Sequence, residues 1–259
     1  MIIVISPAKS LDYESRVRTR RHSEPAFLSD SKQLVGQLKK MSPKQLSGLM
    51  NISSPLGQLN FERYSAWKAP FNPGNARQAV FAFKGDVYLG LKVEEFSAAD
   101  LGFAQNHLRI LSGLYGVLRP LDLMQPYRLE MGTRLQNKRG QNLYEFWDAK
   151  PTRFLNEEFA AMREQKTLIN LASNEYFGVL QPKALEADVV SPVFKDFVNG
   201  KYRVVSFFAK KARGSMAAWI IRKRLKNTER LHEFNVDGYR YSKAESSAAK
   251  PVFLRKKAA

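Results

Sequence analysis

The sequence contains no cysteine among its 259 residues. Disulfide bonds, thiolate zinc sites, iron–sulfur clusters and cysteine nucleophiles are therefore excluded. Histidine is also scarce, because His22, His107 and His232 are the only three and no two have the short spacing of a metal-binding helix. We expect no metal site and no bound cofactor.

Long apolar runs are missing as well. Nowhere do about 18 apolar residues follow one another, so we expect no transmembrane helix and no membrane contact. Residues 1–7 show neither a basic leader nor a small-residue cleavage pattern, and we expect them not to form a signal peptide. These features predict a cytoplasmic protein.

Acidic residues are few relative to basic ones. Lys and Arg number 42 against 24 Asp and Glu, which gives a formal net charge of +18 and an isoelectric point near 10.0. Such an excess concentrates polyanions around a protein and favours nucleic acid as the partner. A solvated basic surface is the simpler alternative.

Six short apolar runs have the length and composition of buried strands. They lie at residues 2–5, 80–83, 168–171, 189–193, 202–208 and 251–254. Helical patterns alternate with them. Ser97 can cap a helix whose apolar face extends to Leu111 and which Gly113 ends, and a second helix is expected over 215–226. The sequence predicts a mixed α/β fold, with a sheet surrounded by helices.

No segment has the composition of a linker between domains. We therefore expect a single compact domain over residues 1–259, of one or two lobes. The low-complexity segment after about residue 241 predicts a mobile tail over 241–259.

Residues 110–120 read Ile-Leu-Ser-Gly-Leu-Tyr-Gly-Val-Leu-Arg-Pro, in which an expected helix runs into a turn with two glycines and a proline can open the next helix. This pattern suggests a helix-hairpin-helix-like element, whose backbone amides grip a phosphodiester without reading bases. Gly113, Tyr115, Gly116 and Arg119 would then contact DNA. The two glycines are farther apart than in the usual core of that motif, and an ordinary packing corner between helices explains them equally well.

Nine cations and no acidic residue lie between positions 201 and 226. They are Lys201, Arg203, Lys210, Lys211, Arg213, Arg222, Lys223, Arg224 and Lys226. We expect a strand-to-helix turn there to contact phosphates, with DNA ligands at Lys210, Lys211, Arg213, Arg222 and Lys223. Neutralisation by distant carboxylates is the alternative. A second basic run is either a solvated loop or a clamp over a bound backbone, and it comprises Arg16, Arg18, Arg20 and Arg21.

Polar side chains follow several of the predicted strands. Ligands of open α/β sheets bind beyond the carboxyl ends of the strands, so these groups could converge on one cleft. The candidates for acid–base chemistry are Ser6, Lys9, Asp86, Arg128, Glu130 and Glu175. Turn chemistry is the alternative, because small polar residues are common at strand ends for conformational reasons.

Five segments are distinctive when they are taken together. They are 5–9 (Ile-Ser-Pro-Ala-Lys), 83–88 (Phe-Lys-Gly-Asp-Val-Tyr), 111–132, 169–176 and 209–214. In this order they resemble the signatures of the bacterial YaaA family, also known as UPF0246 or DUF328. The resemblance covers most of the chain, but the segment beyond about residue 236 matches the family pattern poorly.

The resemblance implies a bacterial cytoplasmic protein of the peroxide stress response that lowers free intracellular iron and so limits oxidative DNA damage. It also implies DNA binding, through a positively charged cleft and a helix-hairpin-helix on an unusual α/β fold. We therefore expect contact with the backbone of duplex or distorted DNA without sequence specificity.

Two other functions stay open from the sequence, which favours binding over catalysis. One is an enzyme acting on nucleic acid or a phosphorylated small molecule through the strand-end cleft, in the manner of a glycosylase. The other is direct iron binding by carboxylates, against which the cation excess argues. The sequence does not predict the oligomeric state.

Overall fold

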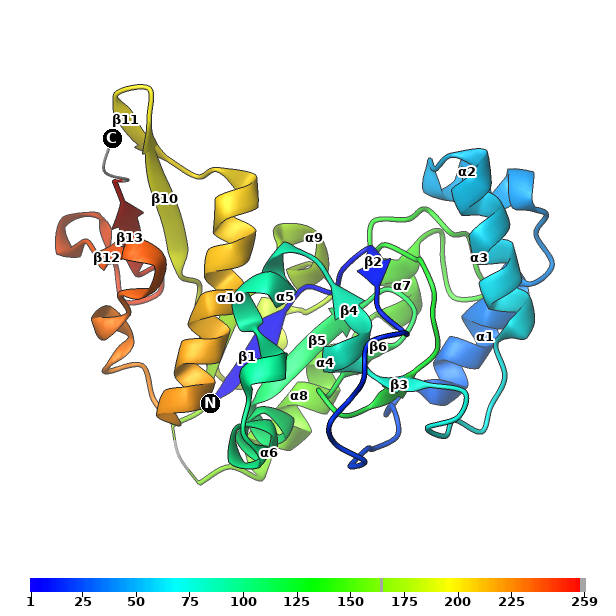
Figure 1. Cartoon of the computed structure of the whole chain (residues 1–259), viewed down its shortest axis with the longest axis horizontal. Helices are drawn as coiled ribbons and strands as arrows, with labels where there is room; N and C mark the ends of the chain where they lie inside the picture. Colours follow the sequence, from blue (N-terminus) through cyan, green and yellow to red (C-terminus); the bar gives the residue numbers. More distant parts are fainter. Residues whose placement is uncertain (164, 257–259) are drawn as a thin grey trace.

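The computed structural model describes residues 1–163 and 165–256, and its centre is a five-stranded sheet in the order β6-β5-β1-β8-β9 (Figure 1). The strands are β1 (Ile2–Ile5), β5 (Leu108–Ser112), β6 (Gly116–Leu118), β8 (Thr167–Leu171) and β9 (Asp188–Val190). β1 runs parallel to β5 and β8, β8 runs parallel to β9, and β6 is antiparallel to β5. β1 is buried along its whole length, which explains its unbroken apolar run. The predicted mixed α/β fold is confirmed.

The α-helices are α1 (Leu28–Leu38), α2 (Pro43–Met50), α3 (Ser54–Ala66), α4 (Ala79–Ala82), α5 (Asp86–Leu91), α6 (Ala98–His107), α7 (Leu143–Trp147), α8 (Lys150–Ala160), α9 (Asn174–Phe177) and α10 (Ser206–Lys223). Most of them lie around this sheet, whereas α2 and α3 pack against each other at one side of the molecule (Figure 1). Two short antiparallel pairs link the loops between them. They join β2 (Ser10–Leu11) to β4 (Phe83–Lys84), and β3 (Arg77–Gln78) to β7 (Leu123–Met124).

A second sheet lies beyond α10, in the order β11-β10-β13-β12 (Figure 1). Its strands are β10 (Val193–Val198), β11 (Lys201–Arg203), β12 (Arg240–Tyr241) and β13 (Val252–Arg255). Within it the buried carboxylate of Asp196 accepts hydrogen bonds from Arg255 Nε at 2.6 Å and from the Tyr239 hydroxyl at 2.9 Å. The mobile tail predicted from residue 241 is therefore corrected as far as residue 256, because β13 is an inner strand of this sheet. Residues 257–259 lie outside the described residues.

α10 lies between the two sheets and crosses α5 at very short range (Figure 1). A Cβ atom on Gly214 would lie 1.8 Å from the carbonyl oxygen of Val87, and one on Gly90 would lie 2.1 Å from the carbonyl oxygen of Lys211. Only glycine allows the two backbones to approach this closely. The crossing fixes the position of α5, which carries part of the candidate site.

The helix-hairpin-helix-like element predicted for residues 110–120 is a β-hairpin. α6 ends at His107, and β5 and β6 then pair with Ser112 opposite Gly116. The helical spacing continues as far as Leu111 because Leu108 and Leu111 of the inner strand β5 are also three residues apart, so periodicity cannot distinguish the two structures. The predicted start of α6 is confirmed, since Ser97 caps the helix and shares a capping box with Asp100.

Three other predicted elements also differ. The apolar run 80–83 belongs mostly to α4, the run 189–193 is divided between β9 and β10, and 202–208 spans the end of β11 and the start of α10. Each run is short enough to suit either a strand or one turn of a buried helix. The surrounding packing decides between them.

Candidate functional site

The loops that follow β1 and β8 meet at the carboxyl edge of the main sheet. The backbone amide of Ser173 donates to Ser6 Oγ at 2.9 Å, and the two hydroxyl oxygens lie 3.4 Å apart. Tyr88 of α5 donates its hydroxyl hydrogen to the carbonyl oxygen of Ser6 at 3.2 Å. The parallel pairing of β1 and β8 therefore brings residues that are far apart in the sequence to one place.

An ion-pair chain lies beside this meeting point. Lys9 Nζ is 2.7 Å from Glu130 Oε2, and Arg128 Nη2 is 3.1 Å from Glu130 Oε1. The side chain of Lys9 is 61% exposed, whereas that of Arg128 is 16% exposed and its Nε atom is buried with no hydrogen-bond partner. Two cations thus neutralise one carboxylate at the edge of the sheet.

Glu175 joins the same region through the backbone. Its Oε1 atom accepts a hydrogen bond of 3.0 Å from the amide of Gly132, two residues after Glu130. The structure therefore brings together five of the six predicted acid–base candidates. We call Ser6, Lys9, Arg128, Glu130, Ser173 and Glu175 the carboxyl-edge cluster. The sixth candidate, Asp86, begins α5 nearby, because a Cβ on Gly85 would lie 3.2 Å from that of Ala8.

Three buried tyrosines lie behind the carboxyl-edge cluster. Burial raises the pKa of Tyr88, Tyr127 and Tyr176 well above that of a free phenol, so all three are neutral hydroxyls at physiological pH. The Tyr127 and Ser112 hydroxyl oxygens lie 2.6 Å apart. Buried, hydrogen-bonded phenols of this kind are typical of a rigid support for a site.

The residues expected to contact DNA from the 110–120 segment are placed differently. Gly113, Tyr115 and Gly116 are buried, and the Tyr115 hydroxyl donates to the carbonyl oxygen of Gln125 at 3.1 Å. Arg119 is half-buried and lies 3.1 Å from the carboxylate of Asp122. The first three residues are therefore inaccessible to a phosphate in this structure, and the glycines serve close packing.

The basic residues of α10 divide between the two ends of the helix. Lys210 is exposed near the N-terminal end, and Arg222 and Lys223 are exposed at the C-terminal end. At about 1.5 Å per residue, some 18 Å separate the two groups. Lys211 lies 3.6 Å from an Asp237 oxygen, and Arg222 lies 2.8 Å from a Glu95 oxygen.

Arg213 is the exception within this helix. It is half-buried, burial lowers the pKa of its guanidinium, and no carboxylate among the described residues pairs with it. The continuous basic patch suggested by the sequence is therefore two separate groups of exposed cations with one partly buried arginine between them.

A β-hairpin formed by β10 and β11 projects beside the N-terminal end of α10 (Figure 1). Phe197 and Tyr202 face each other across it, with ring centres 5.1 Å apart, and they are 38% and 37% exposed. Phe207, at the start of α10, is 56% exposed. Asn199 and Gly200 both have positive φ at the turn, which an Asn-Gly pair favours. This turn signal was present in the sequence and could have revealed the hairpin.

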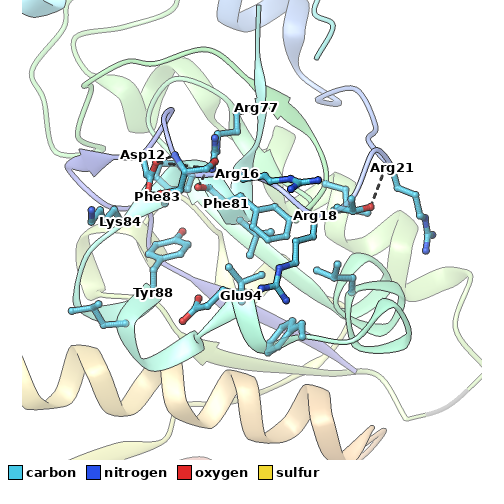
Figure 2. A pocket seen from close by; sticks show the side chains of 18 of the residues that line it. Asp12, Arg16, Arg18, Arg21, Arg77, Phe81, Phe83, Lys84, Tyr88 and Glu94 are labelled. Atoms are coloured by element: carbon cyan, nitrogen blue, oxygen red, sulfur yellow. Dashed lines mark hydrogen bonds and ion pairs between the residues drawn. The ribbon is translucent and has the colours of Figure 1, made fainter. Parts of the chain in front are cut away.

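A cavity of about 480 Å³ opens between the basic segment 12–22 and α5 (Figure 2). We call the segment 12–22 the strap and the hollow beneath it the strap cavity. Arg16, Arg18 and Arg21 of the strap line it together with Lys84. The basic run, for which the sequence allows either a loop or a clamp, therefore covers a hollow. The sequence does not predict this hollow, because its opposite wall comes from residues 77–101.

Neither a metal site nor a membrane span is found within residues 1–163 and 165–256. No group of three or more His, Asp or Glu side chains is placed to hold a metal ion in this part of the chain. None of its helices combines the length and the apolar character needed to cross a bilayer.

Known proteins similar to this chain cover it almost completely. The family model described as "Peroxide stress protein YaaA" matches residues 1–245. A UPF0246 protein of Cellvibrio japonicus (strain Ueda107) is 55% identical over 255 residues, which are 98% of each chain. One from Teredinibacter turnerae (strain ATCC 39867 / T7901) is 54% identical over 256 residues, 99% of this chain and all of the relative. One from Alcanivorax borkumensis (strain ATCC 700651 / DSM 11573 / NCIMB 13689 / SK2) is 53% identical over 257 residues, 98% of each chain.

These alignments reach into the segment beyond residue 236. The relatives therefore align with this segment, for which a weak match to the family pattern is expected, whereas the family model ends at residue 245.

Proposed function

Because the chain belongs to the YaaA peroxide stress protein family (UPF0246), we propose that it acts in the peroxide stress response by binding the DNA backbone. The binding face consists of the β10–β11 hairpin and the N-terminal end of α10. Its exposed cations are Lys201, Arg203 and Lys210, and its exposed aromatics are Phe197, Tyr202 and Phe207.

The two faces of the β10–β11 hairpin carry different chemistry. Side chains alternate along a strand, so Phe197 and Tyr202, which are paired, lie on one face. Lys201 and Arg203 lie on the other face. A two-stranded ribbon fits the major groove, and apolar wedges can enter a distorted base step while cations hold the phosphates. This arrangement of the hairpin is the observation that carries the proposal.

The cations would contact phosphates and the aromatic rings would stack on bases, whatever the base sequence. Binding would therefore be non-sequence-specific and strongly dependent on salt, because each cation that neutralises a phosphate releases counterions. Distorted or unpaired DNA would be preferred, since exposed aromatic rings stack on unpaired bases. Covering DNA in this way would limit its oxidative damage. We also propose that the protein helps to keep the intracellular concentration of free iron low.

Charge reversal tests the proposed face. The triple variant Lys201→Glu, Arg203→Glu, Lys210→Glu should weaken binding to a bubble-containing duplex by at least tenfold, measured by fluorescence anisotropy across a salt series. The slope of log affinity against log salt should fall by about one for each phosphate that the variant no longer neutralises. A variant with aromatic residues removed, Phe197→Ser with Tyr202→Ser, should lose the preference for the bubble over intact duplex.

A double charge reversal on an unrelated surface serves as a control. Lys40→Glu with Lys44→Glu changes exposed cations near α2 and should leave affinity within twofold. Arg222→Glu with Lys223→Glu tests the other end of α10, and weaker binding there would extend the face along the helix. If wild-type protein binds neither DNA, or if binding does not depend on salt, the proposal is wrong.

A second candidate function is an enzyme acting on nucleic acid or a phosphorylated small molecule. It is favoured by the gathering of five predicted acid–base residues in the carboxyl-edge cluster, with Lys9 and Arg128 against Glu130. Product analysis with oxidised and mismatched DNA tests it. A product that disappears in Glu130→Gln, while DNA affinity stays unchanged, would establish catalysis. Unchanged DNA across the lesion panel would leave binding as the function.

A further inference from the structure

We propose that the strap cavity binds a nucleotide-sized aromatic phosphate. This site is separate from the β10–β11 hairpin and does not depend on the function proposed for it. At about 480 Å³, the strap cavity has the size of a small-molecule site and is too small for a duplex.

The inner wall of the strap cavity is apolar and partly aromatic (Figure 2). It is lined by Val80, Phe81, Phe83, Leu89, Phe96 and Leu101. Leu89 is 57% exposed although it belongs to α5, which is otherwise well packed. Exposed apolar surface in a hollow is costly in water and is typical of a place where a ligand packs.

The rim of the strap cavity is cationic. Arg16, Arg18, Arg21 and Lys84 line it, and none of them forms an ion pair with a carboxylate of residues 1–163 or 165–256. Figure 2 shows Arg16 and Arg18 extending over the hollow from the strap. The rim therefore offers several positive charges that this part of the protein does not neutralise.

The nearby carboxylate of Asp12 is engaged elsewhere. Its oxygens accept hydrogen bonds from the Ser15 hydroxyl at 2.7 Å and from the Ser15 and Glu14 amides at 2.9 and 3.0 Å. The hydrogen bonds from Ser15 lower the pKa of Asp12 to about 2. Asp12 thus shapes the start of the strap and leaves the arginines available to a ligand.

One further arginine is held in a fixed position at the rim. Arg77 Nε donates to the carbonyl oxygen of Phe81 at 3.2 Å, and its Nη2 atom donates to the carbonyl oxygen of Ser15. Arg77 thereby ties the strap to the wall opposite it. The strap cavity is consequently a built site and not only a gap beneath a loop.

The chemical class of the ligand follows from these walls. Several unpaired cations suit a group with two negative charges, such as a phosphate monoester, better than a single carboxylate. Aromatic and aliphatic faces suit a planar ring. A fatty acid would also combine a negative charge with an apolar chain. Glu94 at the rim, however, can accept hydrogen bonds from ring amino groups, and a fatty acid has none. A base joined to a sugar phosphate combines all three properties.

The strap provides its own matched control. Arg20 lies between Arg18 and Arg21 in the sequence, but it lines a different cavity on the other side of the strap. Substitution of Arg20 changes the net charge of the strap as much as substitution of Arg18, without altering the rim of the strap cavity.

Isothermal titration with 2′-deoxyadenosine 5′-monophosphate tests the site. We expect binding that Arg18→Glu weakens severalfold and that Arg16→Glu with Arg18→Glu weakens at least tenfold. Leu89→Asn should weaken it severalfold, and Arg20→Glu, the charge-matched control for Arg18→Glu, should change it less than twofold. Deoxyadenosine, inorganic phosphate and octanoate should each bind at least tenfold more weakly than the nucleotide. No binding of the nucleotide at millimolar concentration, tighter binding of octanoate, or an equal weakening in Arg20→Glu would overturn the proposal.

The nucleotide could be free or part of a single strand, and competition distinguishes these sources. A short oligodeoxyadenylate that displaces the mononucleotide, and whose own affinity falls in the Arg16/Arg18 variant, identifies a strand as the source. Failure of the oligonucleotide to compete identifies a free nucleotide. The Lys201/Arg203/Lys210 variant should bind the mononucleotide normally, so failure of the hairpin proposal and failure of this one are distinguishable.

Discussion

The crossing of α10 over α5 gives a sharp prediction for Gly214→Ala. The new methyl group would lie 1.8 Å from the Val87 carbonyl oxygen and 2.9 Å from the Leu91 amide nitrogen. Both neighbours are backbone atoms, so no side-chain rotation can relieve the overlap. The helices would have to separate by roughly 1.5 Å to restore ordinary contact, and we expect a destabilisation of about 3 kcal/mol, at the upper end for overpacked cores.

A control isolates the clash from helix propensity. Gly36 lies in α1 with no atom within 4 Å of the Cβ position, so Gly36→Ala should stabilise the protein slightly. Alanine gains about 0.5 to 1 kcal/mol over glycine within a helix when nothing obstructs it. The two substitutions are chemically identical and should have opposite signs.

Urea and thermal unfolding, followed by circular dichroism, measure the difference. For a chain of this size, 3 kcal/mol corresponds to a fall in Tm of about 6 to 12 °C. If the free energies of unfolding of the Gly214→Ala and Gly36→Ala variants differ by less than about 0.5 kcal/mol, the close crossing does not determine stability and the prediction is wrong.

Three further predictions concern buried side chains. Asp30→Asn should cost about 1 to 2 kcal/mol at pH 7, since Lys150 Nζ lies 2.6 Å from the carboxylate but is partly exposed. Although burial opposes ionisation, hydrogen bonds from Lys150 and a neighbouring arginine lower the pKa of Asp30. The difference in the free energy of unfolding between the wild type and the variant, measured in urea titrations, should therefore persist above pH 3.8 and vanish as the pH falls through the lowered pKa. Asp196→Ala should cost about 3 to 5 kcal/mol in the same titrations, because it leaves the Arg255 guanidinium buried without its carboxylate, whereas a cost below 1 kcal/mol would contradict that role. Trp147→Ala should lower stability by about 3 to 5 kcal/mol, since its ring is fully buried, and an unchanged unfolding midpoint would contradict this.

The centre of the fold was predictable because its signals are local. β1 and β8 are uninterrupted apolar runs between turn residues, and the capping residue Ser97 marks the start of α6. The sequence predicts a helix as far as Leu111, where the structure has the strand β5, because a helix and an inner strand can both carry Leu108, Ile110 and Leu111. Only the pairing with β1, more than 100 residues earlier in the chain, selects the strand.

The sequence likewise predicts one part of the candidate site and does not predict another. Ser6, Lys9 and Glu175 were predictable because strand-end polar groups converge at the edge of a parallel sheet. The strap cavity could not be predicted, because Arg16 and Arg18 face residues that are about 60 to 80 positions away in the sequence. No pattern within the strap indicates its opposite wall.

The position of β13 has a consequence for the order of events during synthesis. β10 is complete at Val198, but its parallel neighbour ends only at Arg255. At about 5 to 20 residues per second, the ribosome needs roughly 3 to 11 seconds to supply the missing strand. The main sheet can close earlier, since its last strand ends at Val190. For those seconds the nascent chain presents an unpaired strand edge beside exposed aromatic rings, which is the interval in which it is most open to capture by chaperones or by another copy.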